Sequence, residues 1–264
     1  MTKQIMVLVV VFLYVLMHSV FIEPNSLEVT RYTIKDNELH GIRVAFLTDF
    51  HLKRKDYKRL DKIVQLTNQQ NPDIVLLGGD FANGHSKKNT MNPKVLAQKL
   101  SLFTSPAYTV LGNHDWWTDG NLLTKELKDH GIKVLENSNT RIILKRRYVD
   151  IVGLADLNTR SVNIAKAFKK TAIPRIVISH NPDVYYDIID DVSLILAGHT
   201  HGGQFVIPFT KPLFVPSKYG SRFASGLVKP TNNTMIISKG LGTSILPIRF
   251  NCKPEVVIID FVKN

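Results

Sequence analysis

The sequence contains a single cysteine, Cys252, so no disulfide can form within the chain. A chain of 264 residues buries enough apolar surface to fold without such cross-links. No cysteine–histidine signature surrounds Cys252, which argues against a thiol nucleophile and predicts a thiol in or near the core. The composition, 44% hydrophobic and 21% charged, excludes a disordered or fibrous chain.

Acidic residues are the scarcer of the two charged classes. The chain has 22 Asp and Glu residues against 34 Lys and Arg residues, a formal net charge of +12. Such an excess attracts anionic partners, namely phosphates, nucleic acid or acidic lipid surfaces. No Pro/Gly/Ser-rich linker, repeat or low-complexity tract interrupts the sequence after its N-terminal segment. We therefore expect one domain over residues 25–264, preceded by a separate segment and link over residues 1–24.

The N-terminal segment lacks the features of a cleaved leader. Residues 5–22 are an almost unbroken apolar run, polar only at His18 and Ser19. As a helix this run spans about 27 Å, just enough for a hydrocarbon core of about 30 Å. No small-x-small cleavage site follows it and no twin-arginine pair precedes it. We favour an uncleaved single-pass anchor in the cell (inner) membrane over a cleaved signal peptide or a buried core helix.

The charges around this segment do not decide its orientation. Lys3 and the amino terminus lie on one side of the apolar run, and Arg31 and Lys35 lie on the other. This balance is too even for the positive-inside rule to apply. The sequence therefore leaves open which side of the membrane holds the domain.

Short apolar runs alternate with helical stretches in the first half of the domain. Strands at about 42–48, 74–77 and 108–111 precede helices expected at about 56–70, 92–101 and 121–130. Apolar runs of this kind indicate strands covered on both faces. The fold class predicted is α/β, a four-layer αββα sandwich of two mixed β-sheets flanked by helices. The second half has a short helix around 161–169 and denser strands, at about 141–145, 148–154, 175–179, 193–197, 234–238 and 255–261.

Residue types that bind metals follow five of the predicted strands, at the point where each strand ends. In open α/β sheets, ligands bind outside the carboxyl ends of the strands. Two of the five blocks hold a pair spaced by two residues, which puts both side chains on one side of an extended chain. The histidines outside these blocks, among them His40, His85 and His130, are expected on the surface or in loops. The blocks are Asp49 and His51 (TDFH), Asp80 (GGD), Asn113 and His114 (GNHD), His180 (ISH), and His199 and His201 (AGHTH).

The chemistry of these residues favours a site for two metal ions. Carboxylate, imidazole and amide ligands without thiolate suit Mn²⁺, Fe or Zn²⁺ better than Mg²⁺ or Ca²⁺. Seven ligands are too many for one ion, but they fit two divalent ions that share a bridging carboxylate. We expect Mn²⁺ to be favoured, with Fe or Zn²⁺ as alternatives.

The five blocks resemble those of the calcineurin-like metallophosphoesterases. The family pattern D-x-H, G-D, G-N-H-D/E, H and G-H-x-H is present in the same order and without a gap, and the resemblance covers roughly residues 42–260. The N-terminal apolar segment and the extended block at residues 198–204 are similar to the membrane-associated bacterial subgroup of YkuE type. The chain departs from some members of this subgroup because it lacks a twin-arginine signal.

The resemblance implies a role for each residue of the site. One metal would be held by Asp49, His51 and His201, with Asp80 as the bridge to the second. The ligands of the second metal would be Asn113, His180 and His199. His114 is not needed as a ligand and is expected to protonate the leaving oxygen or stabilise charge on it. The neighbouring Asp115 is a candidate for orienting the imidazole of His114.

The expected activity is hydrolysis of a phosphodiester or pyrophosphate bond by a membrane-anchored, monomeric enzyme. Anchor, basic charge and metal site together favour a lipid-linked substrate, and the resemblance makes UDP-2,3-diacylglucosamine of lipid A synthesis the leading candidate. A phospholipid diester comes second. The alternative is a nucleotide or nucleic-acid phosphodiesterase with the same two-metal mechanism, although no specific nucleic-acid partner is expected because no such binding motif is visible. A binding scaffold without activity has no reason to keep all seven ligands and His114.

Overall fold

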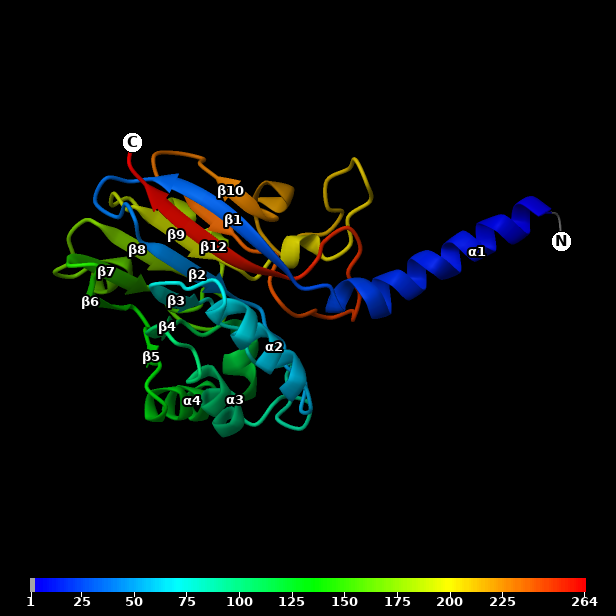
Figure 1. Cartoon of the computed structure of the whole chain (residues 1–264), viewed down its shortest axis with the longest axis horizontal. Helices are drawn as coiled ribbons and strands as arrows, with labels where there is room; N and C mark the ends of the chain where they lie inside the picture. The colour runs from blue at the N-terminus through cyan, green and yellow to red at the C-terminus, as the bar shows by residue number, and fades with distance from the viewer. Residues whose placement is uncertain (1–2) are drawn as a thin grey trace.

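Two six-stranded sheets form the centre of the computed structural model, which describes residues 3–264 (Figure 1). The first sheet has the strand order β1-β12-β2-β3-β4-β5. Its strands are parallel to their neighbours except at the β12–β2 pair. The strands of this sheet are β1 (Glu28–Lys35), β2 (Arg43–Leu47), β3 (Ile74–Leu77), β4 (Ala107–Thr109), β5 (Lys133–Val134) and β12 (Glu255–Val262).

The second sheet packs against the first and has the order β10-β11-β9-β8-β7-β6. The inner pairs β11–β9, β9–β8 and β8–β7 are parallel, and the two outermost pairs are antiparallel. Both sheets are therefore mixed, as the sequence predicts. The strands are β6 (Ser138–Leu144), β7 (Arg147–Gly153), β8 (Arg175–Ile178), β9 (Leu194–Ala197), β10 (Gly226–Val228) and β11 (Met235–Ile237).

Helices cover the outer face of each sheet, which confirms the predicted four-layer sandwich. The first sheet is covered by three helices, α2 (Tyr57–Asn68), α3 (Pro93–Leu100) and α4 (Asn113–Asp129). The layer over the second sheet is thinner, because its elements are short. These are α5 (Ile164–Ala167) and the 3₁₀ helices η3 (Pro182–Asp187) and η5 (Gly220–Phe223). A further 3₁₀ turn, η4 (His201–Gly203), follows β9.

Successive side chains of the central strands point in alternate directions, which explains why one apolar run is buried on both faces of a sheet. In β2, Val44 and Phe46 pack between the two sheets, whereas Ala45 and Leu47 pack under the helices. Successive side chains of a strand point to opposite faces, so an unbroken apolar run supplies both cores. The carboxyl ends of the parallel strands of both sheets then meet along one edge of the sandwich.

Several elements differ from the sequence prediction; the short strands β5 and β10, for example, were not expected. Strand β1 was not expected; it pairs along all eight residues with β12 at the edge of the first sheet, where a half-exposed strand can carry charged residues. Helix α4 begins at Asn113, well before the expected residue 121, and is kinked at Asp119. Its early start follows from Asp115, whose carboxylate accepts the backbone N–H of Gly112 in a capping box.

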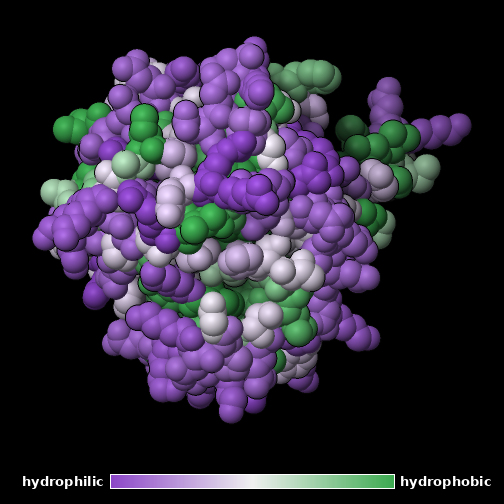
Figure 2. Space-filling model, turned by 60° about the vertical axis from the view of Figure 1, so that its left-hand side comes forward, coloured by the Kyte–Doolittle hydropathy of each residue, from purple (hydrophilic) through white to green (hydrophobic). Residues whose placement is uncertain are grey.

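The N-terminal apolar segment is a helix that projects from the domain (Figure 1). It comprises α1 (Lys3–Met17), a π-helical turn η1 (His18–Ile22) and the 3₁₀ turn η2 (Glu23–Asn25). No residue of α1 is buried, so the alternative of a core helix is wrong. The 23 residues span about 35 Å, long and apolar enough to cross a membrane. Hydrophilic residues dominate the face of the domain that is turned away from this helix (Figure 2).

The end of the helix is integrated into the domain. The backbone N–H of Arg249 donates to the carbonyl of Ser19 at 2.9 Å, and the buried carboxylate of Glu23 accepts the N–H of Cys252. Arg59 of α2 donates to the carbonyl of Pro24 at 3.0 Å. The boundary expected at residue 24 therefore lies within a set of contacts between the segment and the domain.

Arg249 is the largest fully buried side chain in the described part of the chain. Its guanidinium has no carboxylate within salt-bridge distance there and is satisfied instead by backbone carbonyls. Desolvation by burial lowers its pKa, although the group remains charged at neutral pH. The accepting carbonyls, at 2.6 to 3.2 Å, belong to Lys239, Gly240, Gly242 and Cys252.

The loop whose carbonyls bind Arg249 is also hydrogen-bonded to the residue Asp49, which follows β2. The backbone N–H groups of Leu241 and Gly242 both donate to the carbonyl of Asp49. A Cβ on Gly240 would lie only 2.6 Å from the Cβ of Asp49, so this contact requires glycine. Arg249 thus fixes the backbone on which Asp49 stands.

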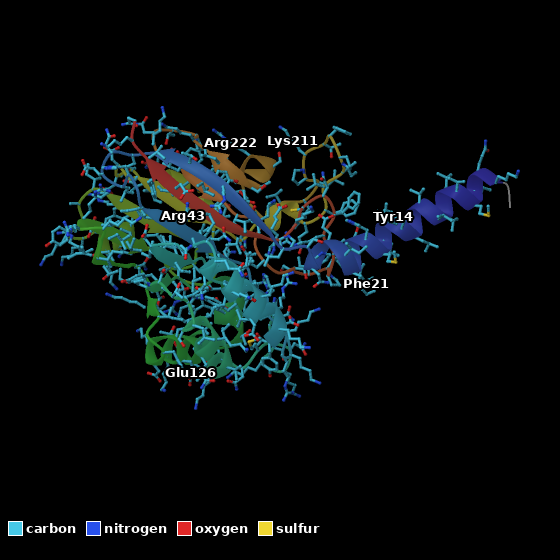
Figure 3. The ribbon with its side chains drawn as sticks, viewed as in Figure 1. Tyr14, Phe21, Arg43, Glu126, Lys211 and Arg222 are labelled. Atoms are coloured by element: carbon cyan, nitrogen blue, oxygen red, sulfur yellow. The ribbon has the colours of Figure 1, made fainter. Side chains whose placement is uncertain are left out.

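We predict that Arg249→Met destabilises the protein by about 3 kcal/mol or more, because each buried carbonyl left without a donor costs about 1–3 kcal/mol. Thermal unfolding of the detergent-solubilised full chain measures the effect. Arg222→Met is the matched control, because Arg222 is exposed (Figure 3) and its replacement is expected to change stability by no more than about 0.5 kcal/mol. Equal melting temperatures for the two variants would contradict this role of Arg249.

Candidate metal centre

The five strand ends meet where the two sheets share an edge. Strands β2, β3 and β4 of the first sheet are followed by Asp49 and His51, by Asp80 and by Asn113, respectively. Strands β8 and β9 of the second sheet are followed by His180 and by His199 and His201. All seven expected ligands come together there, and all except the half-buried His199 are buried.

The backbone at these strand ends is strained. The residues with positive φ include five of the seven expected ligands, at angles between 43° and 71°: Asp49, His51, Asp80, His199 and His201. The extended conformation expected for the two spaced pairs is therefore wrong, because β2 and β9 end before these residues. Left-handed backbone costs non-glycine residues free energy and concentrates at functional sites.

Asp49, His51 and His201 form the first group of ligand atoms. Nε2 of His51 lies 3.1 Å from Nε2 of His201, which in turn lies 3.5 Å from Oδ1 of Asp49. Their ligand atoms all lie within 4.8 Å of one another. This is the set that the family resemblance assigns to one metal ion.

The second group surrounds Nε2 of His180. The other ring nitrogen, Nδ1, donates to the carbonyl of Gly78 at 2.9 Å, which leaves Nε2 to face the site. Nε2 lies 3.2 Å from Oδ1 of Asn113 and 3.2 Å from Nδ1 of His199. In neutral His180, Nε2 carries a lone pair that faces two other acceptor atoms. Their repulsion is relieved when a cation lies between them.

Asp80 lies between the two groups. A single oxygen, Oδ2, is 3.3 Å from Nε2 of His180 and 3.5 Å from Nε2 of His51. Its other oxygen, Oδ1, accepts the backbone N–H of His114 at 2.8 Å. The position matches the bridging role that the resemblance implies for Asp80.

Burial keeps three of the imidazoles neutral. Desolvation lowers the pKa of His51 to about 3 and that of His199 to about 3, and it lowers the pKa of His201 well below its ordinary value. A neutral imidazole is the form that binds a metal ion. These three side chains are therefore ready to coordinate at neutral pH.

Asp80 and His180 stabilise each other's charged forms. Burial opposes the charged form of His180, but the neighbouring Asp80 outweighs it and raises the pKa of His180 well above its ordinary value. Burial likewise opposes ionised Asp80, but the charge and hydrogen bond of His180 hold the pKa of Asp80 below its usual range. Burial raises the pKa of Asp49 to about 6.

Two glycines allow the loops to come this close. A Cβ on Gly112 would lie 2.2 Å from Oδ1 of Asp80, and a Cβ on Gly198 would lie 2.4 Å from Oδ2 of Asp49. Neither position allows a side chain without displacing a carboxylate of the site.

The residues fit a pair of divalent metal ions. Carboxylate, amide and neutral imidazole donors converge in two groups, and Asp80 reaches both. With every imidazole neutral, lone pairs face one another in both groups, and such buried acceptors are unfavourable unless a cation, either a metal ion or a proton on His180, lies between them. The identity of the metal does not follow from this geometry.

His114 stands at the start of α4 on the open side of the cluster. Its Nδ1 donates to the carbonyl of Gly84 at 2.9 Å, and its Nε2 lies 3.5 Å from Oγ of Ser244. The ring lies edge-on to that of His51, with centroids 4.7 Å apart. Its ligand atom also groups with those of His51 and Asp80, so the geometry permits ligation as well as proton transfer.

Asp115 does not orient His114, and this expectation is corrected by the structure. Its carboxylate accepts backbone N–H groups of Asp80, Ala82 and Gly112 at 2.8 to 3.0 Å. Burial, followed by the charge of Asp80, raises the pKa of Asp115 to about 7. Asp115 thus ties the loop after β3 to the start of α4, and the carbonyl of Gly84 orients the imidazole of His114.

Several residues around the centre were missed by sequence reasoning. Asn158 lies 3.4 Å from Nε2 of His199, and the ring of Trp117 packs 4.9 Å from that of His114. His85 is exposed in a loop, as expected, yet its ring packs against both His114 and Trp117. None of these residues stands in a strand-end block, and the contacts arise only when the loops fold together.

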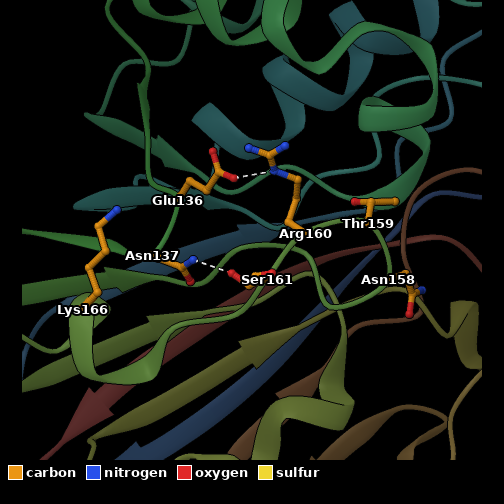
Figure 4. Close-up of a pocket in the computed structure, with 7 residues that line it drawn as sticks. All are labelled: Glu136, Asn137, Asn158, Thr159, Arg160, Ser161 and Lys166. Carbon is orange, nitrogen blue, oxygen red and sulfur yellow. Dashed lines mark hydrogen bonds and ion pairs between the residues drawn. The ribbon is translucent and has the colours of Figure 1, made fainter.

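The centre opens into a cleft of about 950 Å³. Metal-site residues line the cleft together with mainly apolar side chains, among them Leu213, Phe214, Ile245 and Leu246. A polar pocket of about 680 Å³ adjoins this cleft at Asn158. Arg160 and Lys166 line that pocket, and Arg160 pairs with Glu136 at 2.7 Å (Figure 4).

We predict that Asp80→Ala reduces bound metal below two ions per chain and abolishes phosphoesterase turnover, because one carboxylate serves both groups. Inductively coupled plasma mass spectrometry of the folded protein measures the metal content. The control is Asp183→Ala. Asp183 is a buried aspartate outside the metal cluster, and its carboxylate accepts hydrogen bonds from Ser217 and Lys218. An Asp80→Ala protein that retains two metal ions and activity would exclude the bridging role.

We predict that His114→Ala lowers kcat by about 10²–10⁴-fold while the metal content stays at the wild-type level, as for loss of a positioned acid. His130→Ala, at the far end of α4, serves as control and is expected to leave kcat unchanged. Loss of metal from the His114→Ala protein would instead make His114 a ligand, as its proximity to His51 and Asp80 permits.

Comparison with known proteins identifies the family. A family model described as calcineurin-like phosphoesterase matches residues 42–203. Phosphodiesterase YaeI of Escherichia coli (strain K12) is 32% identical over 252 residues, which cover 92% of this chain and 91% of that protein. The uncharacterized metallophosphoesterase YkuE of Bacillus subtilis (strain 168) is 29% identical over 252 residues, 90% of this chain and 86% of that protein.

A longer vertebrate relative and a solved structure are also similar. A Danio rerio protein named transmembrane protein with metallophosphoesterase domain is 29% identical over 239 residues, 84% of this chain and 53% of that protein. The crystal structure of calcineurin-like phosphoesterase YfkN from Bacillus subtilis superposes with a TM-score of 0.46 at 12% identity, covering 76% of this chain and 81% of that chain. The family match and the extent of the YaeI similarity establish that this chain belongs to the calcineurin-like phosphoesterases and is a metal-dependent phosphoester hydrolase.

Proposed function

We propose that the protein is a membrane-anchored hydrolase of a phosphodiester or pyrophosphate bond in a lipid-linked substrate. One observation carries the proposal: the two groups of ligand atoms around Asp80 lie in a cleft whose other walls are mainly apolar. Apolar walls beside the metal centre favour a phosphate ester that carries a hydrophobic group.

The residues of the centre divide the chemical work. Two divalent ions held here, Mn²⁺ by preference, would supply Lewis acidity toward phosphoryl oxygens and activate water near neutral pH. Asp80 lies within reach of both groups and would contribute its carboxylate to each. The Nδ1 of His114 donates to the carbonyl of Gly84, so the imidazolium form of His114 would give its proton to the leaving oxygen from Nε2. Asn158 lies beside His199, where its amide can donate to a substrate phosphoryl oxygen.

The surroundings of the centre suit an amphiphile. The apolar walls of the cleft match acyl chains, and the adjoining pocket with Arg160 and Lys166 matches an anionic, hydrogen-bonding head group. Asn158 lines both spaces, so a substrate phosphate can lie at their junction. The leading candidate is UDP-2,3-diacylglucosamine of lipid A synthesis, and a phospholipid diester is second.

The N-terminal helix serves in this proposal as an uncleaved single-pass anchor in the cell (inner) membrane. Its domain end is held by Arg249 and Cys252, contacts that cleavage near residue 24 would remove. The Danio rerio relative is named a transmembrane protein, which supports membrane attachment of this chain. Because one chain supplies every residue of the centre, a monomer suffices for activity.

A nucleotide phosphodiesterase is the alternative. The polar pocket and the net charge of +12 favour it, since both attract phosphates. The apolar walls of the cleft are unused in that case. Fast hydrolysis of a water-soluble nucleotide ester, with no gain from acyl chains, would support this alternative.

We predict that a short-chain diacyl substrate, kept below its critical micelle concentration, is hydrolysed with a higher kcat/KM than the same head group without acyl chains. Binding energy from groups remote from the reacting bond can raise kcat/KM in this way. Equal values for the two substrates, or faster hydrolysis of the deacylated one, would refute the lipid-linked substrate.

Leu213→Ser tests the wall of the cleft. We expect it to lower kcat/KM for the diacyl substrate about tenfold, the loss of one buried aliphatic contact, and to leave the deacylated substrate unaffected. Ile143→Ser is the matched control, because Ile143 is 64% exposed on β6 and does not line the cleft. Equal effects of the two substitutions would show that the cleft wall does not contribute to substrate binding.

A further inference from the structure

Two loops at the mouth of the cleft expose more apolar surface than the metal centre needs. Rim loop A covers residues 205–216 and rim loop B covers residues 244–250. At their tips Phe209 is 108% exposed and Ile245 is 89% exposed. Isolated exposed apolar residues are ordinary on a soluble protein, but a cluster of them marks an interaction surface. The large apolar side chains exposed in these loops are Ile207, Phe209, Leu213, Phe214, Ile245 and Leu246.

The two rim loops are joined to each other. Phe205 and Phe250 form an isolated parallel bridge, and their rings stack with centroids 5.2 Å apart. Gln204, just before rim loop A, donates to the carbonyl of Ser244 at 2.8 Å and accepts the N–H of Ser244 at 2.7 Å. The loops therefore form one surface.

This surface is continuous with the domain end of the N-terminal helix. The backbone of Arg249 in rim loop B is hydrogen-bonded to Ser19, and the ring of Phe250 lies edge-on to that of His18, with centroids 6.4 Å apart. Figure 1 shows rim loop A, in yellow, protruding beside the point where the helix leaves the domain. A helix of 23 residues spans about 35 Å, slightly more than a hydrocarbon core of about 30 Å, so its domain end lies at the bilayer surface.

Basic side chains accompany the apolar tips. Lys211 is exposed in rim loop A, and Arg222 is exposed on the same side of the molecule (Figure 3). Arg59 bonds the carbonyl of Pro24 at the end of the helix, which places the neighbouring exposed Lys55 and Lys58 near it. Lysine and arginine beside an apolar surface are suited to anionic lipid head groups.

We propose that rim loops A and B insert into the surface of the lipid bilayer beside the N-terminal helix and open the cleft directly toward the membrane. The helix fixes the depth, the apolar tips enter the boundary between head groups and acyl chains, and Lys211 stays at the level of the phosphates. Leu213 and Ile245 belong both to the tips and to the cleft walls, so a lipid-linked molecule can pass from bilayer to cleft without crossing water.

The inference rests on the proposed role of the helix as an anchor, and it can be tested without any assay of activity. In the full chain, Phe209→Cys carries a polarity-sensitive fluorophore; Cys252 is 3% exposed and stays unlabelled. The labelled protein is reconstituted into phosphatidylcholine–phosphatidylglycerol vesicles, with or without phospholipids brominated on their acyl chains. The control is Ile189→Cys, because Ile189 is also 89% exposed but precedes β9, at the opposite edge of the sheet from the metal centre.

We expect the label at residue 209 to shift to shorter wavelength and to lose about half or more of its emission with brominated lipid, as for a group at the boundary between head groups and acyl chains. The label at residue 189 is expected to behave as in water. A label at residue 209 that matches residue 189 would overturn the proposal. A blue shift without quenching would also overturn it, because a second copy of the chain or another protein would then cover the surface.

This outcome is separate from that of the substrate test. If the label at residue 209 is quenched but acylated and deacylated substrates are hydrolysed at equal rates, membrane insertion stands and the lipid-linked substrate is refuted. Unquenched residue 209 together with acyl-dependent hydrolysis would do the reverse.

Discussion

The structure depends on one buried carboxylate between two sets of imidazoles. Oδ2 of Asp80 lies within 3.5 Å of ring nitrogens from both groups, and these nitrogens cannot all satisfy one another. A site that gathers buried acceptors stores unfavourable free energy unless cations occupy it. The strained backbone at five ligand positions shows a second cost of the same arrangement. The two sheets offset both costs. Each sheet is buried on both faces, so its strand ends are held rigidly.

Support for the centre extends outward to the end of the N-terminal helix. Asp115 ties the loop after β3 to α4, and the loop held by Arg249 grips the backbone of Asp49. The same Arg249 bonds Ser19 at the end of the N-terminal helix. A continuous series of hydrogen bonds therefore links the metal centre, rim loop B and the N-terminal helix. In the proposed membrane-anchored form, the contacts that stabilise the ligands would also set the position of the bilayer relative to the cleft.

The strand ends could be predicted from sequence because each block combines an apolar run, which is local, with a ligand type directly after it. The four-layer fold followed from the same runs, since unbroken apolar strands must be covered on both sides. Strand β1 could not be predicted because its pairing with β12 joins residues more than 200 positions apart. The partner of His114 was missed for a similar reason: the carbonyl of Gly84 comes from a loop on another strand, and backbone carbonyls leave no mark in a sequence. Asn158 and the rim loops acquire their significance only from what the fold places beside them.

The central claim is that cations join two groups of ligands through Asp80. A crystal structure of the Mn²⁺-loaded protein, with anomalous scattering recorded above and below the manganese edge, tests it most directly. The account predicts two anomalous peaks, one bound by Asp49 and His201 and the other by Asn113 and His180, with the carboxylate of Asp80 coordinating both. A single peak, or two peaks of which only one is coordinated by Asp80, would contradict it.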